Sequence, residues 1–406
     1  MKKKGTKIRR YGNIYGRGMG SGSWQIVVAM IAGVLLFGVI GWSLYTPIHS
    51  WIAGLGEERP AASSMAPVLS SQPQQEPDDS SSSAQGGAAA LPVLPRPEPQ
   101  TEGTVNGIYL PVSALSDPSV VSGFLERASS AGLNTVVVEA KDATGTVLYA
   151  SKNEIARQLG AEDLAAYDAA AVAKTIRDAG FVPAARLHAF RDNLAPVYER
   201  GMGVRYYDTE SLWYDNDPAQ GGKPWLNPCS AQVREYLVSL ASELVSSGFD
   251  IILLDSVQFP SGLGLEKAGY GIANPDRAQV LDGFITQVRK TVEDAGGRLI
   301  VCLPSDALLP GDEAGDALIT LNNQMIYGGN PAPRMTGQVM VTLSNDPAVS
   351  KGILSRARTE NTQAKWLGLI PAYRNDGSLL GSTSLLSGID PAGYLLYNPS
   401  GNYQLQ

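Results

Sequence analysis

Histidine and cysteine are scarce in this chain of 406 residues, which contains two of each. The histidines are His49 and His188, so a His-rich metal site is excluded, and a Ser-His-Asp triad would have to use His188. The cysteines, Cys229 and Cys302, lie far apart and lack a metal-type spacing. They are either two free buried thiols or, in an oxidising compartment, a disulfide pair. We therefore expect no metal and no other cofactor.

Charged residues are also few, at 17% of the chain, and they are unevenly placed. Residues 1–23 hold seven basic side chains and no acidic one, so the rest of the chain is more acidic than the net charge of −7 indicates. An acidic body repels phosphate groups, which argues against nucleic acid as a partner. Apolar residues make up 44% of the sequence, which is ample for a large core.

One long apolar run stands out, from residue 24 to residue 45, WQIVVAMIAGVLLFGVIGWSLY. As a helix it is long enough to cross a hydrocarbon core of about 30 Å, and aromatic residues flank it at both ends. No good cleavage site follows, so we expect an uncleaved transmembrane helix in contact with the lipid bilayer. The basic residues 1–23 predict a cytoplasmic tail, which places the protein in the cell membrane as a single-pass protein with its C-terminal domain outside.

Residues 46–103 are rich in proline, serine, glutamine and alanine, with SSQPQQEPDDSSSSAQGGAAA at the centre. Such a stretch buries too little apolar surface to offset its ordering entropy, so it predicts a low-complexity linker. The folded domain is expected over residues 104–406.

Short β-rich runs alternate with amphipathic helical stretches throughout this domain, which predicts parallel strands covered by helices. Eight such units favour an α/β fold of the (β/α)8 barrel type, and a doubly wound open sheet is the alternative. Gln338–Leu343 is a ninth strand candidate, which leaves the sixth unit ambiguous. The expected strands are Gly107–Val112, Thr135–Lys141, Phe181–Phe190, Asp250–Val257, Arg298–Leu303, Gln324–Tyr327, Lys365–Ala372 and Gly393–Asn398. The expected helices are Pro118–Ala131, Ala169–Ala179, Ala231–Ser247 and Arg277–Ala295.

Charged side chains lie near the ends of three neighbouring expected strands. Because side chains alternate along a strand, Asp255 shares a face with Leu253, and Glu139 shares one with Lys141. Arg186 and His188 share a face of the strand between them. If these faces point inward, the five charged residues meet at the end of the barrel where such folds place their chemistry. They form either a functional pocket or structural ion pairs.

Further polar and aromatic candidates follow the strands. Asp142 is either a turn residue or a second carboxylate at the rim. Aromatic faces beside amide and carboxylate groups suit sugars, and the long loop after the third strand carries both kinds of side chain. The candidates for sugar contact are Trp213, Tyr214, Trp225 and Asn227 in this loop, and Tyr327, Tyr373 and Tyr397 at later strand ends. Packing of the folded loop onto the barrel is the alternative for the loop residues, and it explains Trp225 equally well.

The domain resembles a bacterial family of barrel domains classed with the glycoside hydrolases, whose members have an N-terminal anchor or signal. The matching pieces are NGIYLP, LNTVVVEAKDATG, PAARLHAFRD, KPWLNPCSAQVREYLVSLASELVSSGFDIILLDSVQFPS and GYLLYNPSGNY, in order across residues 104–406. The resemblance implies that the second strand ends in an acidic-x-Lys-Asp arrangement, matched by Glu139, Lys141 and Asp142.

The fourth strand of the family ends in Asp-Tyr-x-Arg-Phe-Pro, and here the match is partial. Asp255, Phe259 and Pro260 agree, whereas Ser256 and Gln258 replace the tyrosine and the arginine. At the tip of the fifth strand, where relatives place another acid, only Asp306 is present.

Two functions fit these residues. The first is a membrane-anchored glycosidase that acts on a cell-wall or environmental polysaccharide through paired carboxyl groups. Asp255 would be the ionised nucleophile or base, and Glu139, or else Asp142, would be the acid. Lys141, Arg186 and His188 would bind substrate. The second is a catalytically inactive barrel that binds carbohydrate or cell wall as a scaffold.

Overall fold

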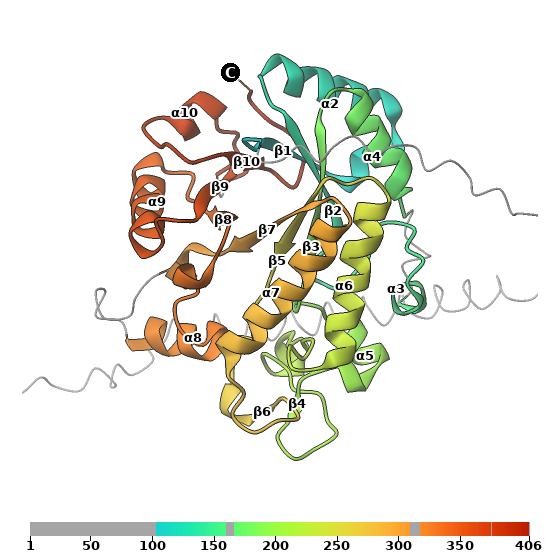
Figure 1. The fold of residues 1–406 in the computed structure, drawn as a ribbon, viewed down its shortest axis with the longest axis vertical. Coiled ribbons are helices and arrows are strands. Elements are labelled where there is room, and N and C mark those ends of the chain that lie inside the picture. The colour runs from blue at the N-terminus through green and yellow to red at the C-terminus, as the bar shows by residue number, and fades with distance from the viewer. Residues whose placement is uncertain (1–102, 160–165, 309–316, 375, 406) are drawn as a thin grey trace, which may run out of the picture. The chain divides into compact units, whose positions relative to one another are not determined.

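The computed structural model describes residues 103–159, 166–308, 317–374 and 376–405, and these fold around a closed barrel of parallel strands (Figure 1). Each strand pairs with the next one along the chain, and β10 pairs back with β1 through Asn106 and Tyr394. The predicted (β/α)8 barrel is therefore confirmed, and the open sheet is excluded. The barrel strands are β1 (Asn106–Leu110), β2 (Thr135–Lys141), β3 (Val182–His188), β5 (Ile251–Asp255), β7 (Arg298–Leu303), β8 (Gln338–Thr342), β9 (Lys365–Pro371) and β10 (Tyr394–Tyr397).

Helices connect consecutive strands on the outside of the barrel (Figure 1). Among the residues that the structure describes, six of them begin at side-chain caps that accept a hydrogen bond from a backbone N–H group of the first turn: Asp117, Asn153, Asp168, Ser230, Asp276 and Asp346. The longer helices are α2 (Pro118–Ser130), α4 (Ala169–Asp178), α6 (Ala231–Ser246), α7 (Arg277–Asp294), α8 (Ala317–Tyr327) and α9 (Pro347–Glu360). Shorter ones are α3 (Glu154–Gln158), α5 (Ala195–Tyr198) and α10 (Ser382–Leu386), with 3₁₀ turns at Val112–Ser116, Arg200–Met202, Pro218–Gln220, Leu265–Lys267, Ser305–Leu308 and Ala332–Arg334.

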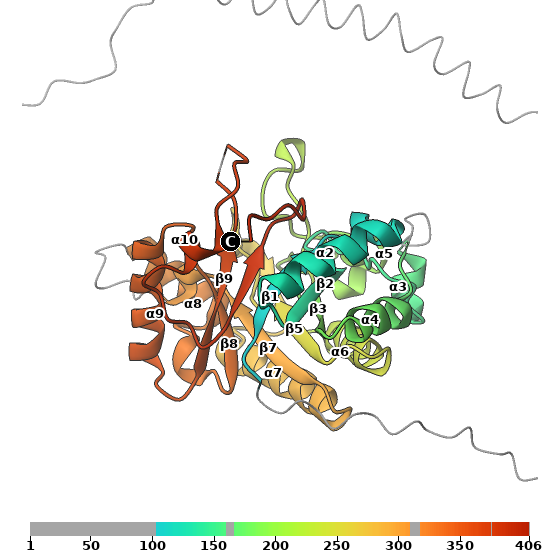
Figure 2. The same ribbon diagram turned by 90° about the horizontal axis from the view of Figure 1, so that it is seen from above.

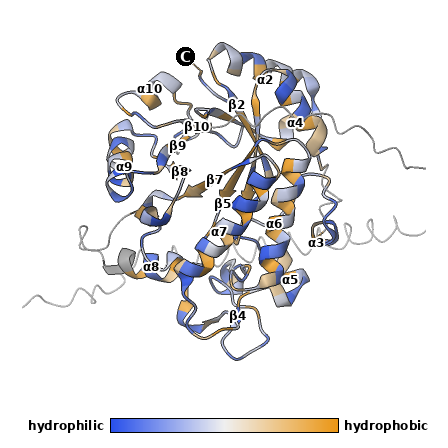
Figure 3. Ribbon diagram, viewed as in Figure 1, coloured by the Kyte–Doolittle hydropathy of each residue, from blue (hydrophilic) through white to orange (hydrophobic). Residues whose placement is uncertain are grey.

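The core has two layers because side chains alternate across the strands. Val136 and Val138 face outward and pack with the helices, whereas Val137 faces inward beside Ala184 and Leu253. Figure 3 shows the same division, since the strands are drawn mainly as hydrophobic and the helices carry hydrophilic stripes on one side. A fully buried Val or Leu side chain contributes about 1.5–3 kcal/mol, so both layers stabilise the barrel.

The sixth strand differs from expectation. Gln324–Tyr327 was expected as a strand but forms the last turn of α8, and β8 occupies the position between β7 and β9 instead. A short apolar run such as QMIY does not distinguish helix from strand by its periodicity, whereas QVMVT is rich in β-branched residues, which favour strands.

A small lobe stands beside the barrel, at the carboxyl ends of its strands. It is built from the connections after β3 and β5, which pair through the short antiparallel strands β4 (Arg205–Tyr206) and β6 (Ala268–Gly269). Figure 2 shows the loop after β4 and the connection after β9 rising on the same side of the barrel.

The predicted tail (1–23), transmembrane helix (24–45) and most of the predicted linker (46–103) lie outside the described residues, so these assignments and the membrane location stay predictions. Within the described ranges, none of the helices is both long enough and apolar enough to cross a membrane. Cys229 and Cys302 are free thiols, as the first of the two readings expected.

Candidate active site

Four ionisable side chains from three adjacent strands meet inside the carboxyl end of the barrel. Glu139 on β2 pairs in register with Arg186 on β3, and His188 on β3 pairs with Asp255 at the end of β5. Their side chains are mostly buried but keep some contact with solvent, with exposed fractions of 8% for Glu139, 11% for Arg186 and His188, and 18% for Asp255. We call these four residues the mouth cluster.

Arg186 lies between the two carboxyl groups. Its Nε and Nη2 atoms donate hydrogen bonds to Asp255 Oδ2 at 3.1 and 2.6 Å, and Nη1 lies 3.6 Å from Glu139 Oε2. The guanidinium carbon also lies 5.2 Å from the centre of the Tyr397 ring, within range of a cation–π interaction. One arginine thus bridges both acids and rests on an aromatic face.

The two carboxyl groups titrate in opposite directions from their ordinary values. Burial raises the pKa of Glu139 to about 8, although Arg186 opposes this shift. Burial would also raise the pKa of Asp255, but Arg186, His188 and the Ser256 backbone N–H together hold that pKa below its usual value. Near neutral pH Glu139 therefore carries a proton while Asp255 is ionised.

His188 is neutral near pH 7 because burial lowers its pKa to about 4, despite the opposing charge of Asp255. Its Nδ1 atom lies 2.7 Å from Ser256 Oγ, and its Nε2 atom lies 3.6 Å from Glu139 Oε1. A hydroxyl group therefore lies within hydrogen-bonding distance on one side of the ring, and a carboxyl oxygen lies just beyond that distance on the other.

Asp255 ends a fully buried run, Ile251–Leu254, where the chain leaves the barrel. Ser256 directly after it has φ 55°, in the left-handed region, and its N–H donates to Asp255 Oδ1 at 2.5 Å. This turn fixes the carboxylate at the mouth, which is why a charged residue follows four buried apolar ones.

Lys141 was expected in this cluster, and the structure corrects that expectation. A register shift after Glu139 pairs Lys141 with Leu187, an outward-facing residue, so Lys141 changes face. Its side chain is 0% exposed, and Nζ lies 2.9 Å from Asp192 Oδ2 and donates to the His188 carbonyl at 3.0 Å. Lys141 is therefore part of a buried ion pair outside the mouth.

Asp142 forms hydrogen bonds within its own loop. Its Oδ1 atom accepts hydrogen bonds from the backbone N–H groups of Thr144, Gly145 and Thr146 at 2.8, 3.1 and 3.0 Å, and from the Thr144 hydroxyl at 2.6 Å. The turn alternative is the one observed. Its charge still contributes to the raised pKa of Glu139.

The aromatic loop after β3 is held together by the residues expected to bind sugar. Trp213 is fully buried and its indole N–H donates to the Gly264 carbonyl, while Trp225 is 4% exposed and donates to Asp215. Asn227 is also buried, and its side chain bonds the Tyr270 carbonyl. These three side chains pack the lobe and do not line the mouth, and Tyr214 between them is partly buried.

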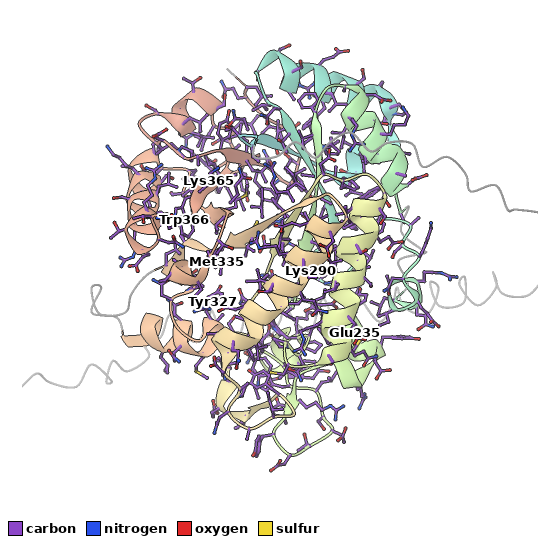
Figure 4. All side chains as sticks on the ribbon, viewed as in Figure 1. Glu235, Lys290, Tyr327, Met335, Lys365 and Trp366 are labelled. Carbon is purple, nitrogen blue, oxygen red and sulfur yellow. The ribbon has the colours of Figure 1, made fainter. Side chains whose placement is uncertain are left out.

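The three later tyrosines lie in different places. Tyr327 ends α8, where its hydroxyl donates to Gln258 Oε1 at 3.1 Å (Figure 4). Tyr373 follows β9 and is partly buried, whereas Tyr397 ends β10 beside Arg186. Asp306, the acid available at the fifth strand, is exposed in the turn after β7. Of the expected aromatic residues, Tyr397 is the one in contact with the mouth cluster.

Three further residues belong to this region and were not predicted from the sequence. Tyr109 faces inward on β1 and hydrogen bonds Glu139, and strand parity alone places it there. Asp192, the partner of Lys141, follows His188 by four residues. Ser256, noted only as a departure from the family pattern, is the hydroxyl next to His188.

The small lobe contains a cavity. It has a volume of about 430 Å³ and lies between the loops that follow β3 and β5, and Tyr206, Tyr207, Asn227 and Tyr270 are among its lining residues. Glu139 and Asp255 do not line it, so the chemistry and this cavity are separate features of the same face. In the described ranges no three His, Cys, Asp or Glu residues are placed to hold a metal ion.

The fold and the mouth cluster together define a (β/α)8-barrel protein with buried acids at the carboxyl ends of its strands, the end where such barrels carry their active sites. The family model described as "Putative glycosyl hydrolase domain" matches residues 107–301, which contain all four residues of the cluster. No curated protein matches the chain.

Solved structures with similar folds include a hypothetical protein from Ruminiclostridium thermocellum, at 24% identity and a TM-score of 0.42, with 48% of this chain and 96% of that one covered. A family 20 β-N-acetylglucosaminidase is 13% identical with a TM-score of 0.45, over 74% of this chain and 65% of that one. The α-galactosidase from Lactobacillus brevis is 12% identical with a TM-score of 0.44, over 74% and 38% of the two chains.

Proposed function

We propose that the barrel hydrolyses glycosidic bonds, with Glu139 as the proton donor and Asp255 as the ionised partner. The observation that carries this proposal is the opposite shift of the two pKa values within one small cluster. Glycoside hydrolysis requires such a pair, because one carboxyl must give a proton to the leaving oxygen while the other attacks the sugar or activates water.

Arg186 supports this division of roles. Its two hydrogen bonds go to Asp255 Oδ2, which keeps that carboxylate ionised, whereas its distance to Glu139 is longer. Asp255 Oδ1 accepts from the Ser256 N–H, so the whole carboxylate is fixed in orientation before substrate arrives. Glu139 is the more deeply buried acid, and this drier setting keeps its proton in place near neutral pH.

The proposed substrate is a cell-wall or environmental polysaccharide. An extracytoplasmic site, tethered by residues 24–45, would meet such polymers, and the acidic charge of the chain after residue 23 favours a neutral over an anionic substrate. Deletion of residues 1–45 is expected to release the protein from the membrane fraction. Retention of the shortened protein in that fraction would contradict the anchor.

A panel of purified polysaccharides incubated with the full-length protein tests the activity. Release of reducing ends by the wild type, lost in Asp255→Asn and in Glu139→Gln, is the expected result. Turnover that survives Asp255→Asn would refute the assignment of this residue.

A non-catalytic barrel that binds carbohydrate is the second candidate. It is favoured by the pairing of Arg186 with Asp255, since a carboxylate with both oxygens engaged is less free to attack. Binding of a glycan without turnover, unchanged in Asp255→Asn, would favour this candidate over the first.

A further inference from the structure

A hydroxyl, an imidazole and a carboxyl group lie next to one another in a row within the mouth. Ser256 Oγ is 2.7 Å from His188 Nδ1, and His188 Nε2 is 3.6 Å from Glu139 Oε1. The order nucleophile, base and orienting acid is that of acyl-transfer triads, which are recognised by geometry and roles and not by position in the sequence. Glycosidic cleavage by Glu139 and Asp255 does not need this hydroxyl.

The groups on either side of His188 favour the tautomer that this chemistry requires. Glu139 Oε1 is buried, and within the described part of the chain no donor meets it with hydrogen-bond geometry. A proton on His188 Nε2 would face this oxygen at 3.6 Å and leave the Nδ1 lone pair to accept the Ser256 hydroxyl proton, for which Asp255 Oδ1 at 3.5 Å is the other acceptor. Burial lowers the pKa of His188 to about 4, so the ring is unprotonated at neutral pH, and the charge of Asp255 is what favours the proton that the ring accepts.

The backbone at Ser256 has the conformation of a strained turn that presents a side chain. Its φ of 55° is uncommon for a residue other than glycine, and such strain persists where surrounding contacts fix it. Here the Ser256 carbonyl accepts from the Phe190 N–H at 3.2 Å, and the Ser256 N–H donates to Asp255. The turn follows directly after β5, as a nucleophile at the end of a strand requires.

A donor for the developing oxyanion follows the serine directly. Val257 is buried, and its backbone N–H donates to no acceptor among the residues that the structure describes. Buried N–H groups are nearly always paired, so this one is available for a ligand. In the α/β-hydrolases the N–H group of the residue after the nucleophile is one of the oxyanion donors.

We propose that Ser256 is the nucleophile of a second activity, the hydrolysis of O-acyl esters, with His188 as its base and Glu139 as the residue that orients His188. This proposal does not depend on glycosidic cleavage. Ser256 Oγ bonds to the ester carbonyl carbon as its proton passes to His188 Nδ1. The carbon–oxygen bond to the alcohol then breaks, and the alcohol leaves with that proton. Water attacks the acyl-enzyme in the same way, releasing the carboxylic acid and restoring the serine.

Asp255 assists this step through its charge. Its Oδ1 atom lies 4.0 Å from His188 Nδ1, so the imidazolium that forms during the transfer meets an ionised carboxylate. The mouth is partly open to solvent, which admits the water for deacylation.

A fluorophosphonate probe tests the nucleophile, because it forms a stable bond to an activated serine and expels fluoride. The full-length protein is incubated with the probe and with 4-nitrophenyl acetate in separate reactions. We expect one adduct by intact mass, mapped to the peptide that contains Ser256, and steady release of 4-nitrophenol. Ser256→Ala should lose both signals, and His188→Gln should slow labelling by about 10²- to 10⁴-fold.

Ser344→Ala is the matched control, since Ser344 also follows a barrel strand but its hydroxyl accepts from the Asp346 N–H and meets no histidine. It should label and turn over as the wild type does. The absence of an adduct on the folded wild-type protein, or an adduct mapped to another residue, would overturn the proposal. Because the mapping uses the wild type, this outcome is decisive even if Ser256→Ala fails to fold.

Discussion

The two halves of the barrel mouth differ in chemistry. The strands β2, β3 and β5 contribute the mouth cluster, whereas the inward positions of β7, β8, β9 and β10 carry mainly apolar or aromatic side chains, Cys302, Met340, Leu369 and Tyr397. The apolar half excludes water from the charged half and adds no competing carboxylate. Burial is accordingly the largest influence on the pKa values of Glu139 and His188.

This comparison explains how two neighbouring acids acquire different charge states. Both face the same apolar wall, but Arg186 donates two hydrogen bonds to Asp255 and none to Glu139. The unequal contacts of one arginine therefore leave Glu139 protonated and Asp255 ionised near neutral pH. Changes to the charged half should alter catalysis, and changes elsewhere should alter stability or binding.

Asp255→Asn should have the largest effect. It removes the ionised carboxylate and leaves Arg186 without its anionic partner, so kcat/KM for a cleaved polysaccharide should fall by about 10⁴-fold. Asp306→Asn is the control, because Asp306 is an exposed acid at the neighbouring strand end. A comparable loss of kcat/KM in both variants would show that the acid of the charged half contributes no more to catalysis than an exposed acid at a neighbouring strand end.

Glu139→Gln should reduce kcat/KM by about 10²- to 10⁴-fold, because a proton donor is lost. Since the pKa of Glu139 is raised to about 8, the wild type should be active below that pH and lose activity as the pH rises through it. The variant should lack this basic limb in its pH–rate profile. If Glu139→Gln keeps the basic limb of the pH–rate profile, that limb belongs to a group other than Glu139.

Lys141→Met should lower the free energy of unfolding by about 3–5 kcal/mol, because it leaves the fully buried Asp192 carboxylate unpaired. Denaturant unfolding measures this loss. The matched control is Lys174→Met, whose ion pair with Asp178 is exposed and should contribute less than about 1 kcal/mol. Equal effects of the two substitutions would contradict the buried position of Lys141.

Tyr397→Leu should have the smallest effect, because it removes an aromatic face from Arg186 but no charge. A cation–π contact of this kind contributes about 1 kcal/mol, so KM should rise about fivefold with kcat nearly unchanged. A large fall in kcat would instead place the tyrosine among the groups that act on the reacting atoms.

Most of the fold could be predicted from the sequence. Buried parallel strands appear as apolar runs, and capped amphipathic helices have clear boundaries. The helices α2, α4, α6 and α7 each end one residue before the expected position. The sixth strand could not be assigned, because the choice between Gln324–Tyr327 and Gln338–Leu343 depends on pairing with β7 and β9.

Within the site, strand parity identified Glu139, Arg186, His188 and Asp255 as neighbours. It failed for Lys141, because a bulge inserts one residue and reverses the faces beyond it, and one sequence does not reveal a bulge. Composition suggested that Trp213 and Trp225 bind sugar. Aromatic residues that pack a loop have the same composition, and only their hydrogen bonds to Gly264 and Asp215 distinguish the two roles.

The protonation state of Glu139 is the most direct test of the central claim. Carboxyl groups of the full-length protein are titrated by infrared difference spectroscopy between pH 4 and 10, with Glu139→Gln used to assign the signal. We expect one carboxyl to titrate at a pKa of about 8, to vanish in Glu139→Gln, and to move to lower pH in Asp255→Asn, because Asp255 raises this pKa. If every carboxyl titrates in its ordinary range near pH 4, the two acids are not differentiated and the proposed division of roles is wrong.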